Sequence, residues 1–175
     1  SPRLTLTARP GTAPLRGAEK PATAIWGFEG TAPGPILRVR QGERLDATLV
    51  NRLAQPTSIH WHGIRVPNDM DGVPGVTQDA TMPGELFPYS FVCADAGTYW
   101  YHPHGNSSEQ LGRGLWGVLV VEEALPPRAD RELVWVLGDW KLKDDGTIDP
   151  DFANVQERTH EGRIGNTITV NGAPG

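Results

Sequence analysis

The sequence predicts an all-β chain, folded as a Greek-key β-sandwich of roughly seven or eight strands. Apolar residues alternate with polar ones over many short stretches, as they do along strands that bury one face. The 21 glycines and 16 prolines provide the turns that such a fold requires. No stretch keeps helical periodicity for more than two turns. The 175 residues are enough for one well-buried domain, or for one domain and part of another.

The first half of the chain contains several alternating stretches separated by turns. Residues 3–7 predict an edge strand followed by a loop. The strand signals strengthen at residues 25–28, where Trp and Phe alternate with small residues. Two further alternating stretches, 37–40 and 45–49, flank the turn at Gln41-Gly42-Glu43. We therefore expect these two stretches to form a hairpin with one buried face.

The second half places histidines at the ends of strands. Short strands are expected at residues 59–62, 87–92, 97–101 and 115–123. Residues 63–86 form a long loop rich in Gly, Pro and Asp. A long loop inside a compact domain is more often functional than accidental. Residues 106–114 are expected to be a polar connection before the last strand.

A boundary is expected at Pro126-Pro127, after the last strand of the sandwich. Beyond it, residues 133–137 and 166–172 predict only two further strands. Two strands are marginal as an independent unit. We therefore expect residues 128–175 to be poorly ordered, or to be completed by a neighbouring subunit that pairs with the exposed edges.

Composition excludes several classes of partner and site. The chain has 16 Lys and Arg against 21 Asp and Glu, a net charge of −5, so no nucleic-acid partner is expected. The single cysteine, Cys93, rules out a disulfide within the chain. No apolar run is long enough to span a membrane. No signal peptide is visible, but a mature exported protein would also lack one.

Two matching histidine pairs are the most informative feature of the sequence. Four of the five histidines lie in two His-x-His units, at His60 and His62 and at His102 and His104. In a strand, residues i and i+2 face the same side, so each pair projects together if Pro103 leaves the second unit extended. Neutral imidazole is a common ligand of copper and zinc. The pattern predicts a metal site, which would have four imidazoles and no thiolate if the two pairs come together.

The histidine pairs and their flanks resemble a known family. The resemblance rests on Pro33-Gly34-Pro35, His60-Trp61-His62-Gly63, Asp71-Gly72-Val73-Pro74 and Gly97-Thr98-Tyr99-Trp100-Tyr101-His102-Pro103-His104-Gly105. Together these segments resemble the N-terminal cupredoxin domain of the laccase-like multicopper oxidases. The resemblance covers residues 24–123 closely and extends more loosely to 138–140 and 170–172. It implies a cupredoxin-like Greek-key β-sandwich at 1–125 and the incomplete start of a second cupredoxin domain at 126–175.

The resemblance also implies roles for individual residues. His60 would be a ligand of a type 2 copper, and His62 a ligand of one of two paired type 3 coppers. His102 and His104 would each bind one type 3 copper. Asp71 would be the catalytic acidic residue that holds water near the trinuclear cluster and helps to supply protons. A carboxylate that caps a turn remains the alternative for Asp71.

Some of the copper ligands of the family have no counterpart in this chain. In the family a C-terminal domain supplies four more histidines and the His-Cys-His segment of the type 1 copper. Cys93 has no histidine beside it, so it is not the type 1 cysteine and is expected to pack as a small hydrophobe. His160 is expected to be solvated. Trp61, Trp100 and Trp116 are expected to pack around the site rather than to relay electrons.

The function implied by the resemblance is that of one part of an oxidase. The complete enzyme would couple one-electron oxidation of a small reducing substrate to reduction of O2 to water, in the periplasm or outside the cell. Its partners would be the remaining cupredoxin domains, and it could form a homo-oligomer. The 175-residue chain alone is expected to be inactive.

Two alternatives remain open. One is a stand-alone copper- or zinc-binding module without redox turnover. The other is a zinc hydrolase or lyase, because His-x-His with a third histidine also suits catalytic zinc and Asp71 could act as its base. Metal analysis would separate copper from zinc.

Overall fold

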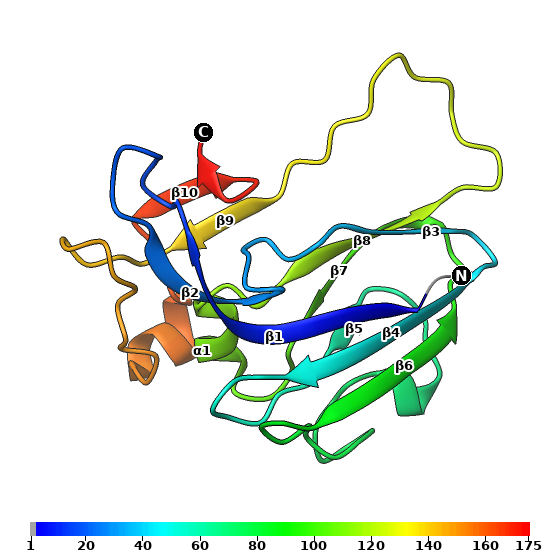
Figure 1. Ribbon diagram of the computed structural model, residues 1–175, viewed down its shortest axis with the longest axis horizontal. Coiled ribbons are helices and arrows are strands. Elements are labelled where there is room, and N and C mark those ends of the chain that lie inside the picture. The colour runs from blue at the N-terminus through cyan, green and yellow to red at the C-terminus, as the bar shows by residue number, and fades with distance from the viewer. Residues whose placement is uncertain (1–2) are drawn as a thin grey trace.

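The computed structural model describes residues 3–175, and its first eight strands form two four-stranded sheets (Figure 1). One sheet has the order β2-β1-β4-β6, and its strands are β2 (Thr23–Phe28), β1 (Leu4–Ala13), β4 (Arg44–Asn51) and β6 (Leu86–Val92). The other has the order β3-β8-β7-β5, and its strands are β3 (Leu37–Arg40), β8 (Gly117–Glu122), β7 (Gly97–His102) and β5 (His60–His62). The predicted all-β sandwich is confirmed.

The first strand is longer and more central than the sequence indicated. β1 has ten residues, and it pairs with β4 in parallel along 4–8 and with β2 in antiparallel fashion along 8–13. The prediction of an edge strand followed by a loop was wrong. The alternation of residues 3–7 marks only the half that pairs with β4. The second half contains Pro10 and Gly11, and it does not show the same alternation.

The predicted hairpin between β3 and β4 is also wrong. β3 pairs in parallel with β8, whereas β4 pairs with β1 and β6, so the chain crosses from one sheet to the other at Gly42. Gly42 has φ +85° in this turn, a conformation that favours glycine. Alternation correctly identified a buried face on each strand, but it carries no information on which strand lies alongside.

The core between the two sheets is rich in aromatic side chains. Trp61 is 1% exposed, and its ring meets Tyr89 and Phe91 at centroid distances of 5.6 and 5.2 Å. Cys93 is fully buried in the same core, as expected for a small hydrophobe. Because Trp61 points into the core, the two histidines on either side of it on β5 point away from the core.

A smaller sheet follows the sandwich along the chain. It consists of β9 (Leu137–Trp140), β10 (Thr167–Val170) and β11 (Ala173–Pro174), in the order β11-β10-β9. The predicted strand 133–137 and the observed strand β9 thus share only residue 137. Residues 123–136 form the long connection that leaves β8 in Figure 1.

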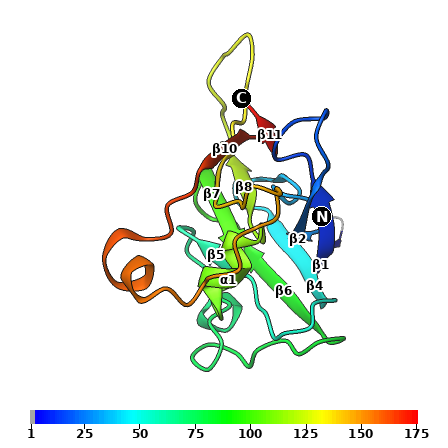
Figure 2. The same ribbon diagram turned by 90° about the vertical axis from the view of Figure 1, so that its left-hand side faces the viewer.

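The small sheet packs against the first sandwich, beside β2 and the end of β1 (Figures 1 and 2). Trp140, Leu142 and Ile148 share a buried cluster with Leu15 and Ile25. One side of the small sheet is therefore buried against the same chain. The expectation that residues 128–175 are poorly ordered or need a second subunit was wrong for that side. The other side carries exposed Leu137 and Ile168. The division into domains at residue 126 stays a prediction.

Helices are short and lie outside the sheets. They are the 3-10 turn η1 (Asn68–Met70), helix α1 (Ser107–Gly112) and the π-helical turn η2 (Glu157–Glu161). In Figure 2, α1 is labelled near the centre and η2 is the orange coil at the left. Within residues 3–175, no helix has the length and apolarity needed to cross a membrane.

Candidate metal centre

The two histidine pairs meet because β5 and β7 are neighbouring antiparallel strands. His60 lies directly opposite His102, and His62 lies opposite Trp100. Alternation along each strand puts these four side chains on one face, while Trp61 enters the core. The structure therefore brings the two predicted pairs together, on the outer face of the second sheet.

Three of the four histidines form a tight group. The ligand nitrogens of His60, His62 and His102 all lie within 4.8 Å of one another. The closest approach is between the Nδ1 atom of His62 and the Nε2 atom of His102, at 3.2 Å. His104 lies beyond the end of β7, is exposed, and has its ring centroid 5.1 Å from that of His60.

Backbone carbonyls fix the orientation of two of the rings. The Nδ1 atom of His60 is 2.7 Å from the carbonyl oxygen of Asp71, and the Nδ1 atom of His102 is 2.7 Å from that of Pro103. A carbonyl oxygen only accepts, so each Nδ1 must carry the hydrogen and donate it. The Nε2 atoms of His60 and His102 are then free to bind a metal, as expected for imidazole ligands.

The carboxylates of Asp71 and Asp79, both in the long loop, differ in their surroundings. One oxygen of the Asp71 carboxylate lies 3.5 Å from the Nδ1 atom of His60, and the Asp71 side chain is 36% exposed. Asp79 is exposed, and it is the backbone carbonyl of Asp79 that accepts a hydrogen bond from Gln78. The acceptors beside the His60 and His102 rings are thus backbone carbonyls, with the Asp71 carboxylate as an additional neighbour of His60.

Burial keeps the imidazole of His102 in its neutral, ligand form. Burial lowers the pKa of His102 to about 4, and the hydrogen bond to Pro103 only partly opposes this. His102 is therefore neutral near pH 7 and can bind a metal without first losing a proton. An all-imidazole donor set without thiolate suits copper or zinc. The residues present fit the copper that the sequence implies.

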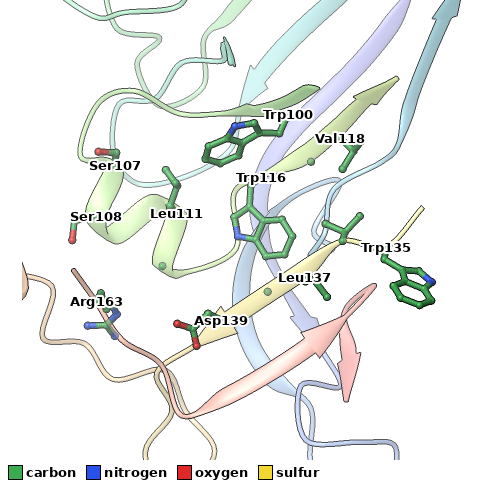
Figure 3. A pocket seen from close by; sticks show the side chains of 14 residues that line it. Trp100, Ser107, Ser108, Leu111, Trp116, Val118, Trp135, Leu137, Asp139 and Arg163 are labelled. Carbon is green, nitrogen blue, oxygen red and sulfur yellow. The ribbon is translucent and has the colours of Figure 1, made fainter. Parts of the chain in front are cut away.

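An indole ring covers part of the group. Trp100 stacks on His102 at a centroid distance of 4.0 Å and an interplanar angle of 30°, and it lies 5.0 Å from His62. It also lines a cavity of about 620 Å³ together with Leu111, Trp116 and residues of β9 (Figure 3). Trp116 packs against Trp140. Trp61, Trp100 and Trp116 all make the packing contacts that the sequence predicted.

Other residues near the site were missed or correctly set aside. Ser58 and Gln110 are polar yet fully buried, and both lie close to the histidine segments. No sequence pattern marked these two residues, because a lone Ser or Gln in a polar segment usually faces solvent. His160 is exposed and hydrogen-bonded to Thr159, as expected for a solvated histidine.

The fold and the histidine group can now be compared with known proteins. The family model described as multicopper oxidase matches residues 11–125. The chain belongs to the multicopper oxidase family. Copper is therefore the metal that family membership implies for the histidine group, and the laccase-like resemblance seen in the sequence is confirmed.

Several proteins are similar in sequence to this multicopper oxidase chain. Copper resistance protein A of Pseudomonas syringae pv. tomato is 39% identical over 153 residues, which are 83% of this chain and 24% of that protein. Multicopper oxidase MmcO of Mycobacterium tuberculosis is 39% identical over 137 residues, 78% of this chain and 26% of that protein. The chain thus spans about a quarter of the length of these relatives.

A solved structure extends the agreement to the fold. The crystal structure of a multicopper oxidase from Pseudomonas thermotolerans superposes with a TM-score of 0.92 at 46% identity, covering 99% of this chain and 42% of that chain. The cupredoxin-like sandwich that the resemblance implied is confirmed. Because the match covers 99% of this chain, it includes the small sheet as well as the sandwich.

Proposed function

We propose that this chain is part of a multicopper oxidase and that its four histidines are ligands of a trinuclear copper cluster. The observation that carries the proposal is the convergence of three ligand nitrogens within 4.8 Å, on rings oriented by backbone carbonyls. His60 would bind the type 2 copper through Nε2. His62 and His102 would bind one type 3 copper, because their Nδ1 and Nε2 atoms face each other. His104 would bind the other type 3 copper.

The chemistry of the bound metal would be stepwise one-electron transfer that reduces O2 to water. The protein groups prepare the site for it. Asp71 holds the Nδ1–H group of His60 through its carbonyl oxygen, while its partly exposed carboxylate can exchange protons with solvent beside the same ring. Trp100 covers one face of His102 and excludes water there.

The remaining parts of the proposal concern the complete protein. A small reducing substrate, O2 and further cupredoxin domains would be its partners, and it could form a homo-oligomer. The type 1 copper would be bound outside the 175 residues described by the sequence, because Cys93 is buried in the core with no histidine beside it. We place the protein in the periplasm or outside the cell on the basis of the family resemblance.

The donor set also favours one second candidate, a copper- or zinc-binding module without redox turnover. Four imidazoles accept zinc as well as copper. A zinc hydrolase or lyase has weaker support, since the Asp71 carboxylate lies against the ring N–H of His60. The carboxylate is thus beside the ring nitrogen that points away from the metal position, whereas a base would face an open coordination position.

Metal competition tests the proposal. The purified chain would be exposed to equal concentrations of Cu(II) and Zn(II), dialysed, and analysed for bound metal and for the electron paramagnetic resonance spectrum of nitrogen-ligated copper. Copper should be retained in preference to zinc, following the usual order of divalent affinities. A variant with all four site histidines replaced by alanine should retain neither. Retention of zinc with exclusion of copper would overturn the proposal.

A further inference from the structure

His104 is held differently from the other three histidines. His60, His62 and His102 lie in the paired strands β5 and β7, so the ladder fixes their spacing. β7 ends at His102, and Pro103 has no N–H group with which to continue the ladder. His104 is exposed, so packing of its own ring does little to locate it. Its position must therefore depend on the backbone before and after it.

A buried polar side chain anchors the segment that follows His104. Gln110 in α1 is 0% exposed. Its Oε1 atom accepts a 2.7 Å hydrogen bond from the Thr57 hydroxyl, and its Nε2 atom donates 2.8 Å bonds to Gln55 Oε1 and to the Pro56 carbonyl. Every partner of the Gln110 amide thus lies in residues 55–57, three to five positions before His60.

Further contacts connect the same stretches, among them a 3.1 Å hydrogen bond from Gln55 Nε2 to Glu109 Oε1. Asn106 donates a 2.7 Å hydrogen bond to Gln55 Oε1. Ser58, which is fully buried, donates a 2.7 Å bond to the Gly72 carbonyl and accepts a longer one, 3.4 Å, from the His104 backbone N–H. These five residues, Gln55, Thr57, Ser58, Asn106 and Gln110, are called the clasp below.

We propose that the clasp sets the position of His104, with Gln110 as its main positioning residue. The proposal rests on the proposed copper function of the four histidines. Helix α1 has only six residues, and a helix of that length is not stable without tertiary contacts. Gln110 supplies such contacts and so holds helix α1, which begins two residues after Gly105, in a fixed position. Ser58 holds the other side, at the His104 N–H.

The polar character of the clasp makes it selective for one arrangement. A buried amide that loses a partner carries a desolvation penalty, so Gln110 is stable only where all three of its hydrogen bonds are made. An apolar side chain at this position would tolerate small sliding of α1 over residues 55–57. The clasp therefore holds His104, which lies in a loop, at a fixed distance from the three histidines of strands β5 and β7.

A double-mutant cycle on copper affinity tests the proposal. The variants are Gln110→Met, which keeps the side-chain length but removes the three hydrogen bonds, and His104→Ala, each alone and combined. Copper(II) affinity would be measured by competition with a chelator, and the melting temperature alongside it. Loss of a group that orients a metal ligand weakens metal binding by about 10- to 100-fold. We expect about tenfold for Gln110→Met, and little further loss when His104 is already Ala.

The control is Thr169→Val, which removes a different fully buried hydrogen bond, that from Trp140 in the small sheet. It should lower the melting temperature without changing copper affinity. The proposal is overturned if Gln110→Met weakens copper binding equally in both His104 backgrounds, or lowers only the melting temperature. Should Gln110→Met not fold, Thr57→Val removes one clasp hydrogen bond and enters the same cycle. Absence of copper binding by the unaltered chain would instead refute the proposed function.

Discussion

Gly72 lies directly against the carbonyl group of Ile59, so that a Cβ atom on Gly72 would be 1.8 Å from the Ile59 oxygen. Gly72 also has φ +74°, a conformation that favours glycine. This close approach brings the long loop onto the strand that carries His60. It places the Asp71 carbonyl oxygen 2.7 Å from the Nδ1 atom of His60. The loop is thus connected to the metal centre through its backbone.

Replacing Gly72 by Ala should therefore damage both stability and metal binding. Overpacking against backbone and a strained positive φ together should cost about 2–4 kcal/mol of unfolding free energy. The loop must move, which draws the Asp71 carbonyl away from His60 and weakens copper binding. Chemical denaturation and copper titration would measure the two effects.

Gly75 in the same loop offers a matched control. It has φ +76° but no atom within 4 Å of the position of a Cβ. Gly75→Ala should therefore show the conformational cost alone, about 1 kcal/mol, with unchanged copper affinity. Equal effects of the two substitutions would show that strain, and not the approach to Ile59, dominates at Gly72.

The separation of the four histidines predicts unequal effects of removing them. His62 and His102 present nitrogens 3.2 Å apart, so they are placed to share one copper ion. Replacing either by Ala should remove that ion, and replacing both should cost little more than replacing one. Copper stoichiometry measured for the two single variants and the double variant would check this. His160→Ala, at an exposed residue of η2, should leave the stoichiometry unchanged.

Asp71→Asn should separate metal binding from proton supply. The contact that orients His60 comes from the Asp71 backbone carbonyl, which the substitution leaves in place. Copper content should stay near normal, whereas reduction of O2 by the complete enzyme should slow because the carboxylate is lost. Metal analysis and O2 consumption would be measured on the same preparation. Loss of copper would assign Asp71 a structural role, as in the turn-capping alternative.

Much of the site followed from the sequence because strand geometry is regular. The spacing of His60 and His62 specifies one face of a strand, and the alternation with Trp61 specifies which face meets the core. The meeting of the two histidine pairs in one cluster came from the resemblance to the family, and the pairing of β5 with β7 that achieves it is seen in the structure. The local pattern alone would not have brought the two pairs together.

The parts that could not be predicted depend on long-range contacts. The hairpin expected between β3 and β4 failed because each strand has a buried face that fits several partners. Gln110 lies in a polar segment and is buried only because residues 55–57 supply partners for its amide. Residues 128–175 were expected to be poorly ordered or completed by a neighbouring subunit, because two strands alone are marginal. The packing of the small sheet against Leu15 and Ile25 joins residues more than 100 positions apart, which local patterns do not reveal.

Cys93 should behave as a packed apolar group with a pH-dependent contribution to stability. Burial raises the pKa of its thiol from the ordinary value of 9.0 to about 11. The unfolded chain therefore loses this proton first, and stability contributed by Cys93 should fall as the pH rises from 9.0 to about 11. Denaturation curves across this range would show the fall, which Cys93→Ala should reduce. In the folded protein at pH 8, a thiol reagent should react far more slowly than after unfolding.

The 175-residue chain should bind copper without sustained oxidase turnover. Three of its four site histidines lie on one face of the second sheet, and His104 lies just beyond β7, so further coordination positions of each bound ion would be open to water, buffer or a second copy of the chain. A symmetric pair of chains could supply eight histidines, but a two-fold arrangement cannot reproduce a cluster with one type 2 and two type 3 ions. Cys93 is buried without a neighbouring histidine, so no thiolate copper centre is present in the described residues to pass electrons from a substrate. The copper-loaded chain would be assayed with a phenolic substrate under air. Steady O2 consumption with water as the product, at about 1 s⁻¹ or faster, would falsify this prediction.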